Sequence, residues 1–390
     1  MLYTAIVLYL IFLVYIFDIK DMQKHYKFHT RFVLFVFVLL LGLRYRMAPD
    51  TVAYMTDFKS IPTLFNLTTN NFTFSRYQPF WIILTSFCKL FDSFVLVQII
   101  CALIVNSGVF YFFKNTSAKF FTCILFYYVI NFFYFNMEIM RESLAVSFFL
   151  VSVVKYNNKK YWQVFLFMFI AFMFHQFAAF LFVIPFFLSS LVSENVKKIM
   201  GVAFLVFVLM LDDPVTFISN YLSSSFSAQL SLYELVEVDK MKITGYIYAL
   251  LRILPIIIIL LSYRNKSLPY VKLDKKIMVN LLLMYIIIVV IRTFSIPFLE
   301  RFANYFIMYA IVAIVGWSYD LISKFTHKIF HFQAIVVVAF VSFLFYNLPL
   351  LKVDPIFNAP LYKRYYPYYS IFSELRDPDR EWIIRKEAKE

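Results

Sequence analysis

Long apolar segments recur from one end of this 390-residue chain to the other. Many reach about 18 residues, the length at which an apolar helix can cross the hydrocarbon core of a bilayer. Hydrophobic residues make up 62% of the chain and charged residues only 15%, so apolar side chains cover every face of these helices. A soluble protein does not need apolar side chains on every face of its helices. The sequence therefore predicts an all-α polytopic membrane protein with about 11–13 transmembrane helices.

The basic residues cluster in short loops between the apolar segments, and the formal net charge is +14. Such clusters mark cytoplasmic loops and attract anionic lipid, so membrane lipid rather than nucleic acid is the partner that this charge implies. The three cysteines lie in apolar segments without metal-ligand spacing. Walker and HExxH motifs are absent from the sequence, and the cysteines show no metal-ligand spacing, so neither a cofactor nor a metal is implied.

The charge pattern predicts one transmembrane domain over residues 1–350 and a polar C-terminal tail over 351–390. External loops are expected at about 44–78 and 212–243, the second with an interfacial amphipathic helix. The apolar segment 79–91 is short, and whether it crosses the bilayer stays open. The tail is basic, which favours the cytoplasm, whereas the count of spans places it outside.

Ionisable residues at membrane depth are costly, and they point to function. The positive-inside pattern places four groups of them on the outward side. They are Arg44, Arg46 and Asp50 at the end of the second apolar segment; Glu138, Arg141 and Glu142 in a tight turn; His175 in a hairpin over 161–191; and Glu300 and Arg301 near Asn304 and Tyr305. Each group also has a structural reading as a snorkelling arginine, a helix cap, a local ion pair or a core histidine. Their common side favours a shared site.

Arginine forks bind phosphate and pyrophosphate oxygens in pairs, so arginines that converge at one membrane face predict such a ligand. A carboxylate or histidine beside them can take a proton from an attacking hydroxyl. Without a nucleotide motif, the donor must already be activated in the membrane, as a lipid-linked pyrophosphate sugar is. The predicted binding residues are Arg44, Tyr54, Arg141, Arg292, Arg301 and Tyr305, and the catalytic candidates are Asp50, His175, Glu138 and Glu142. Arg252, in another apolar segment, is expected to snorkel or to pair with a carboxylate.

Five short motifs occur in order along nearly the whole chain. They are Leu43-Arg44-Tyr45 with Pro49-Asp50-Thr51 and Tyr54; Met140-Arg141-Glu142-Ser143-Leu144-Ala145; His175; Arg301-Phe302 with Tyr305; and Tyr366-Pro367-Tyr368. In these motifs the chain resembles the EpsG-type branch of the Wzy-like polysaccharide polymerases of bacteria. It departs from that pattern at Ala48-Pro49, where a glycine is common before the aspartate, and at Glu142, where a glutamine is common.

The resemblance implies an inner-membrane glycosyltransferase with a GT-C-like fold that works without metal. Such an enzyme joins oligosaccharide repeat units carried on undecaprenyl pyrophosphate, on the periplasmic face, to make O-antigen or exopolysaccharide. Carried over by motif, Arg44, Arg141 and Arg301 hold the pyrophosphate, and Asp50 or His175 is the base or orients the acceptor. A chain-length regulator protein is a further expected partner.

Two other functions compete with this interpretation. A flippase or other transporter of lipid-linked glycans needs charges along a central cavity through the bilayer, and such proteins usually have paired halves. An acyl- or phospho-group transferase needs a nucleophile pair, and the sequence shows none. The charges gather at one end of the spans and no internal repeat is visible, which favours the polymerase.

Overall fold

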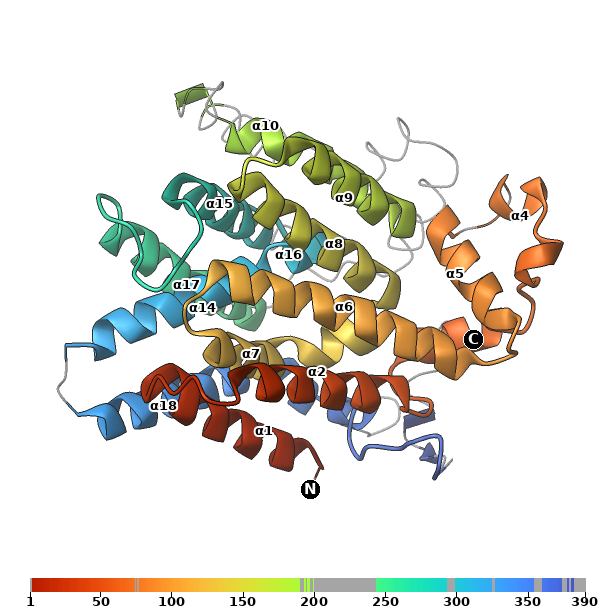
Figure 1. The fold of residues 1–390 in the computed structure, drawn as a ribbon, viewed down its shortest axis with the longest axis horizontal. Coiled ribbons are helices and arrows are strands. Elements are labelled where there is room, and N and C mark those ends of the chain that lie inside the picture. Colours follow the sequence, from red (N-terminus) through yellow and green to blue (C-terminus); the bar gives the residue numbers. More distant parts are fainter. Residues whose placement is uncertain are drawn as a thin grey trace.

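The computed structural model shows a bundle of helices (Figure 1). The residues that it describes are 2–73, 75, 77–189, 193, 195–196, 199, 243–292, 299–324, 327–353, 360–373, 377–378 and 380–381. The predicted external loop 212–243, including the stretch expected as an amphipathic helix, lies outside the described residues apart from residue 243. Within the described residues the chain is all helical, without strands, as the sequence predicts.

The described residues of the first half form ten α-helices and four shorter π- or 3-10 helices. In order they are α1 (Leu2–Leu13), η1 (Val14–Ile19), α2 (Tyr26–Gly42), α3 (Pro49–Phe58), η2 (Leu64–Asn66), α4 (Thr69–Thr73), α5 (Pro79–Lys89), α6 (Phe94–Thr116), α7 (Phe120–Ile130), η3 (Tyr134–Glu138), α8 (Met140–Asn157), α9 (Tyr161–Phe174), η4 (Gln176–Val183) and α10 (Ile184–Leu188). The described second half contains α14 (Ile243–Ser262), α15 (Lys275–Arg292), α16 (Leu299–Asn304), α17 (Ile307–Ile322), α18 (Lys328–Asn347), η5 (Leu348–Leu351) and η6 (Leu361–Arg364).

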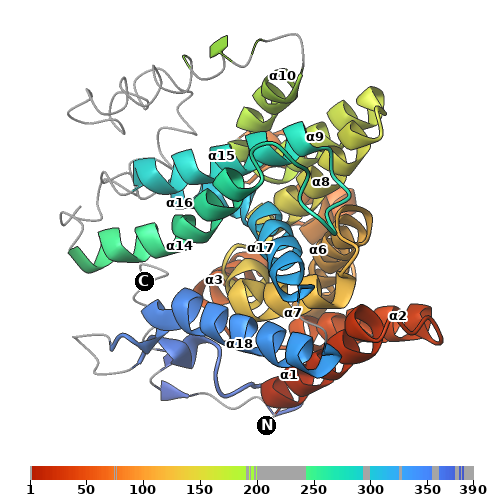
Figure 2. The ribbon, with the colours of Figure 1, turned by 90° about the vertical axis from the view of Figure 1, so that its left-hand side faces the viewer.

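The core of the bundle lies around α17, which the other helices surround in Figure 2. This helix is as apolar as its neighbours, and its fully buried side chains include Met308, Tyr309, Val312 and Ala313. The outer helices are different, because α18 buries only Ile335 and Ala339 and leaves large side chains such as Phe340 exposed. Apolar outer faces of this kind suit contact with lipid.

Four helical segments of the described chain are long and apolar enough to cross a membrane. They are Leu2–Ile19, Phe94–Thr116, Gly245–Ser262 and Lys328–Asn347. Shorter apolar helices lie over Phe120–Ile130, Tyr161–Phe174, Gln176–Leu188 and Ile307–Ile322. These segments support a membrane protein, while the total of 11–13 spans and the GT-C-like architecture stay predictions.

The loops with basic residues gather at one end of the bundle, toward the left of Figure 1. The turn after α6 pairs with the loop before α15, since Ala118 N–H donates to the Tyr270 carbonyl and Lys272 N–H to the Thr116 carbonyl, both at 2.8 Å. The end of α8 joins them through Asn157, whose side-chain oxygen accepts from Asp274 N–H at 2.9 Å. The loops that the sequence predicts to be cytoplasmic therefore share one end.

The opposite end is formed by the segment that follows α2. Gly42 ends that helix against α6, where a Cβ atom would lie 2.5 Å from a side-chain carbon of Ile99. Residues 43–48 then pack against the C-terminal tail. Three backbone hydrogen bonds join them: Tyr45 N–H to Tyr369 O at 2.9 Å, Ile371 N–H to Leu43 O at 2.9 Å, and Ala48 N–H to Arg364 O at 3.3 Å. The described tail residues thus lie at the same end as the first motif.

Two short elements complete this end. Helix α5 has 11 residues, about 16 Å of length, so it is too short to cross a hydrocarbon core of about 30 Å. Helix α9 ends where His175 adopts an extended backbone, with φ −150° and ψ 122°. The rings of Phe172 and Phe182 then lie 6.4 Å apart, so the chain turns back at His175, as the predicted hairpin requires.

Candidate functional site

Arg141 lies in the first turn of α8, at the end of the bundle formed by residues 43–48 and the tail. Its Nε–H donates to the Tyr54 hydroxyl at 2.9 Å and its Nη1 to Gln78 Oε1 at 3.1 Å, while the guanidinium lies 4.6 Å from the Tyr77 ring centre. A guanidinium has five N–H donors, so three of them make no hydrogen bond among the described residues. The group is held in place and still has donors for a ligand.

Asp50 stands in the first turn of α3, directly after Pro49 at the helix start, where a carboxylate suits the helix dipole. Burial raises the pKa of the Asp50 carboxyl to about 6; the Arg301 and Arg141 charges and a hydrogen bond with Tyr54 oppose this rise. An acid with such a pKa is a stronger base than an exposed carboxylate when it is ionised.

His175 completes the group from the turn after α9. It is 3% exposed, it lies within electrostatic reach of Arg141 and Arg301, and its Nδ1 atom has no hydrogen-bond partner among the described residues. Gln78 links the two segments, because it accepts from Arg141 and donates to Gln176 at 3.4 Å. Asp50, Tyr54, Arg141, His175 and Arg301 are called the arginine cluster below.

Glu142 lies behind Arg301 and is 1% exposed. Its Oε1 accepts from Asn304 Nδ2 at 2.8 Å, and its Oε2 lies 3.8 Å from Arg301 Nη1. Tyr305 is fully buried within electrostatic reach of Glu142 and Arg301, and its hydroxyl has no hydrogen-bond partner among the described residues. In this geometry the Glu142 carboxylate faces Asn304 and Arg301.

Arg44 was predicted to bind phosphate, and the structure places its guanidinium inside the protein. It is 2% exposed and donates to Thr51 Oγ1 at 3.0 and 3.2 Å, to the Leu41 carbonyl, and to the sulfur of Met140 at 3.2 Å. These contacts fasten the end of α2 to α3 and α8. Arg44 therefore holds together the helices that carry Asp50 and Arg141, and its donors point to these protein groups rather than into the arginine cluster.

Glu138, the last residue of η3, faces the tail. Its carboxylate accepts from Arg364 Nη1 at 3.2 Å and from the Tyr365 hydroxyl. The Tyr365 carbonyl in turn accepts from the Tyr3 hydroxyl at 2.7 Å, so the tail also contacts the first helix. Glu138 is close enough to Asp50 for its charge to raise the Asp50 pKa.

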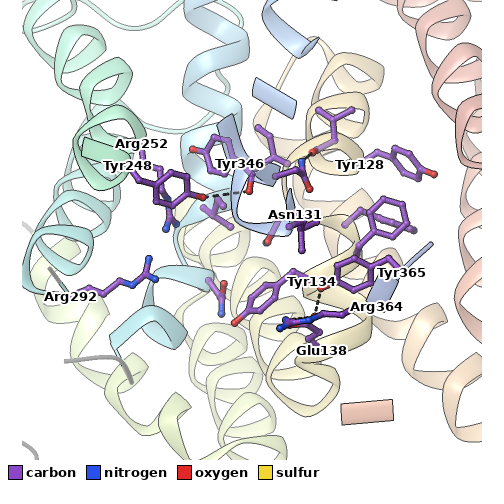
Figure 3. Close-up of a pocket in the computed structure, with 18 residues that line it drawn as sticks. Tyr128, Asn131, Tyr134, Glu138, Tyr248, Arg252, Arg292, Tyr346, Arg364 and Tyr365 are labelled. Atoms are coloured by element: carbon purple, nitrogen blue, oxygen red, sulfur yellow. Dashed lines mark hydrogen bonds and ion pairs between the residues drawn. The ribbon is translucent and has the colours of Figure 1, made fainter. Parts of the chain in front are cut away.

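Figure 3 shows a cavity of about 340 Å³. Three arginines line it, Arg252, Arg292 and Arg364, together with Glu138 and Asn304. Asn304 also donates a hydrogen bond to Glu142, which lies beside Arg301. One residue therefore connects the lining of the cavity with the Glu142–Arg301 pair. The site therefore consists of two neighbouring groups of cations.

The motifs and this geometry agree with a comparison against known families. A family model for the EpsG family matches residues 27–370. The chain belongs to the EpsG family. This is a family of Wzy-like polysaccharide polymerases, so membership implies a glycosyltransferase-like polymerase that acts on a lipid-linked sugar in the membrane. Comparisons with curated proteins and with solved structures give no match.

Two residues that line the cavity of this EpsG-family protein, Arg252 and Arg364, were not among the predicted site residues. Arg252 had a visible signal, a charge in the middle of an apolar segment, but it was expected to snorkel or to pair with a carboxylate. Arg364 had none, because it lies in a basic tail and meets Glu138 across 226 positions of sequence. Arg292, predicted to join the arginine cluster, lines the cavity. Among the described residues no group of three His, Cys, Asp or Glu side chains could hold a metal ion.

Proposed function

We propose that this protein is an inner-membrane polysaccharide polymerase. It joins oligosaccharide repeat units carried on undecaprenyl pyrophosphate, by metal-independent glycosyl transfer on the periplasmic face. The observation that carries the proposal is that Asp50 and His175 lie within electrostatic reach of the same two arginines, Arg141 and Arg301. Two proton acceptors beside two phosphate-binding groups fit a reaction in which a hydroxyl attacks and a pyrophosphate leaves.

In this reaction a hydroxyl oxygen of one repeat unit bonds to the anomeric carbon of another. The bond from that carbon to the lipid pyrophosphate breaks, and the hydroxyl proton goes to Asp50 or His175. Negative charge develops on the leaving pyrophosphate, where Arg141 and Arg301 stabilise it. Fixed guanidinium groups suit this task because they need no rearrangement as the charge appears.

The base has two candidates. Asp50 is favoured by its pKa of about 6 and by its hydrogen bond with Tyr54, which Arg141 also binds. His175 is favoured by the buried, unpartnered Nδ1 atom. Glu142 and Asn304 position Arg301, and Glu138 lines the neighbouring cavity. A GT-C-like architecture and a chain-length regulator partner are part of the proposal through the family resemblance.

A transporter of lipid-linked glycans is the second candidate. The observation that favours it is Arg252, which lines the cavity from the middle of a membrane-spanning helix. Charges along a cavity at membrane depth are what such a transporter needs. The two functions differ in where single repeat units accumulate when the protein fails.

The test compares polysaccharide chain length on gels after Arg141→Ala and His175→Ala. Arg264→Ala is the matched control, because Arg264 is exposed in the loop between α14 and α15. The polymerase predicts loss of long chains in the first two variants and single repeat units on the outer face of the membrane. Repeat units trapped on the inner face indicate the transporter, and unchanged long chains in both variants refute the polymerase assignment at these residues.

A further inference from the structure

Arg141 is held in place by groups that carry no charge. Its hydrogen-bond acceptors are the Tyr54 hydroxyl and Gln78 Oε1, and its guanidinium carbon lies 5.4 and 4.6 Å from the ring centres of Tyr54 and Tyr77. Other arginines of the described chain pair with carboxylates: Arg46 with Glu381, Arg301 with Glu142, and Arg364 with Glu138. Arg141 makes no such pair among the described residues, so its full positive charge is available to an anionic ligand.

Gln78 occupies the N-cap position of α5, yet its side chain does not cap that helix. The helix starts without it, because the Gln78 carbonyl accepts from Trp81 N–H at 3.1 Å and from Ile82 N–H at 3.2 Å, and Pro79 needs no acceptor at the first helical position. The residues preferred at N-caps have short side chains whose oxygen accepts from the first turn. The longer Gln78 side chain instead reaches away from the helix to Arg141.

The other end of the same amide contacts the turn that carries His175. Gln78 Nε2 donates to Gln176 Oε1 at 3.4 Å, and Gln176 directly follows His175. Helix α5 also packs against the end of α9, where the ring of Phe80 lies 5.6 Å from that of Phe174 (Figure 1). The start of α5 therefore contacts both the first turn of α8 and the turn after α9.

Tyr77 connects the same segment to α3. It is half-buried, and its hydroxyl donates to a carboxylate oxygen of Asp57. Asp57 belongs to the helix that also carries Asp50 and Tyr54. The ring of Tyr77 faces the Arg141 guanidinium, and such a cation–π contact holds a cation without placing a negative charge on it. Residues 77 and 78 thus join the three segments that supply most of the arginine cluster.

We propose that Gln78 is a positioning residue for the glycosyl transfer: it fixes Arg141 without neutralising it, and it sets the spacing between Arg141 and the turn of His175. The inference rests on the proposed function, in which Arg141 stabilises the leaving pyrophosphate and His175 is a candidate base. An amide suits both contacts, because its oxygen accepts from a guanidinium and its nitrogen donates to Gln176. A carboxylate in its place would bind Arg141 more strongly, but it would offset the charge and repel pyrophosphate oxygens.

The test uses Gln78→Glu and Gln78→Leu in the purified full chain. Two quantities are measured: the affinity for undecaprenyl pyrophosphate, and kcat and KM for polymer formation from lipid-linked repeat units. The same two substitutions at Gln23 are the matched controls, because Gln23 is exposed in the loop before α2, at the other end of that helix from the first motif. Thermal unfolding of each variant is compared with that of the wild type.

Gln78→Glu is expected to bind undecaprenyl pyrophosphate at least about tenfold more weakly than the wild type, because it places a negative charge beside Arg141. Gln78→Leu leaves that charge intact, so its affinity is expected to stay within about threefold, while its kcat falls about 10–100-fold as Arg141 and His175 lose their spacing. The Gln23 variants are expected to equal the wild type. A purely structural role predicts the reverse order, since glutamate keeps the shape of glutamine and its bond to Arg141.

The proposal is overturned by Gln78→Glu with wild-type affinity, or by Gln78→Leu with wild-type kcat. If Gln78→Leu does not fold, the affinity of the nearly isosteric Gln78→Glu variant decides. Arg141→Ala serves as the reference in the binding measurement. Wild-type affinity in Arg141→Ala contradicts the proposed role of Arg141 in the reaction, whereas a loss confined to Arg141→Ala, with both Gln78 variants unchanged, contradicts only the positioning role of Gln78.

Discussion

Replacement of Arg141 by lysine separates the charge of this side chain from its geometry. Arginine uses one N–H toward Tyr54 and one toward Gln78, which fixes the plane of the guanidinium and leaves three N–H donors for pyrophosphate oxygens. Lysine keeps the positive charge, but its ammonium cannot bind both partners in the same plane and offer a fork to the ligand. Arg141→Ala removes both charge and fork.

The magnitudes follow from the bonds that each variant loses. A hydrogen bond to a charged group contributes about 1.5–3 kcal/mol. If Arg141 gives two such bonds to the leaving pyrophosphate, Arg141→Ala loses about 3–6 kcal/mol, which is about 10²–10⁴ in rate. Arg141→Lys retains one bond and loses about 1.5–3 kcal/mol, or about 10–100-fold.

The assay is the initial rate of polymer formation from purified lipid-linked repeat units, with Arg264→Lys as the matched control and equal amounts of each protein. We expect the order wild type, Lys variant, Ala variant, with the control equal to wild type. A Lys variant within about threefold of the wild-type rate contradicts a forked contact, because loss of one bond alone accounts for about tenfold. Equal losses in both variants, together with lower thermal stability, assign Arg141 a structural role.

Three further predictions test the surroundings of the cluster. Polymer formation is expected to rise with pH through about 6, the pKa of the partly buried Asp50, because a base must be ionised to accept a proton; a profile that is flat across that value excludes Asp50 as the base. Glu142→Ala is expected to destabilise the protein by about 1–3 kcal/mol, since it leaves the buried Asn304 amide without its carboxylate acceptor, whereas Glu142→Gln keeps an acceptor for Asn304; equal thermal unfolding of the two variants contradicts this. Glu381→Ala removes both 2.6 Å hydrogen bonds to Arg46 and is expected to speed hydrogen exchange at residues 43–48; Arg46→Glu with Glu381→Arg should restore protection if the pair holds the tail.

Sequence patterns predicted the features that depend on neighbours along the chain. The apolar segments of the described chain form helices, as α6 over Phe94–Thr116 shows, because an apolar segment is visible without knowledge of its distant partners. The break at His175 was also visible, since the apolar segment was too long for one span. The common end of the basic loops was also predictable, because their charge is visible in the sequence.

What sequence could not predict are contacts between segments far apart. The burial of Arg44 depends on Thr51, Met140 and the end of α2 closing around it, and nothing near Arg44 distinguishes that outcome from exposure to a ligand. Arg364 is one basic residue among several in the tail, and only the folded chain brings it to Glu138. The cavity could not be predicted for the same reason, because its lining residues come from distant segments that include α7, α14, α15, α16, α18 and the tail.

The contact of the tail with Tyr3 and Glu138 has a consequence for the order in which the protein is made. Residues 364 and 365 leave the ribosome after every described transmembrane helix, at a rate of about 5–20 residues per second. A nascent chain can therefore insert all those helices while one wall of the cavity is still missing. The tail segment that contains Tyr365 joins α1 to Glu138, so this wall of the cavity forms only after that segment has left the ribosome.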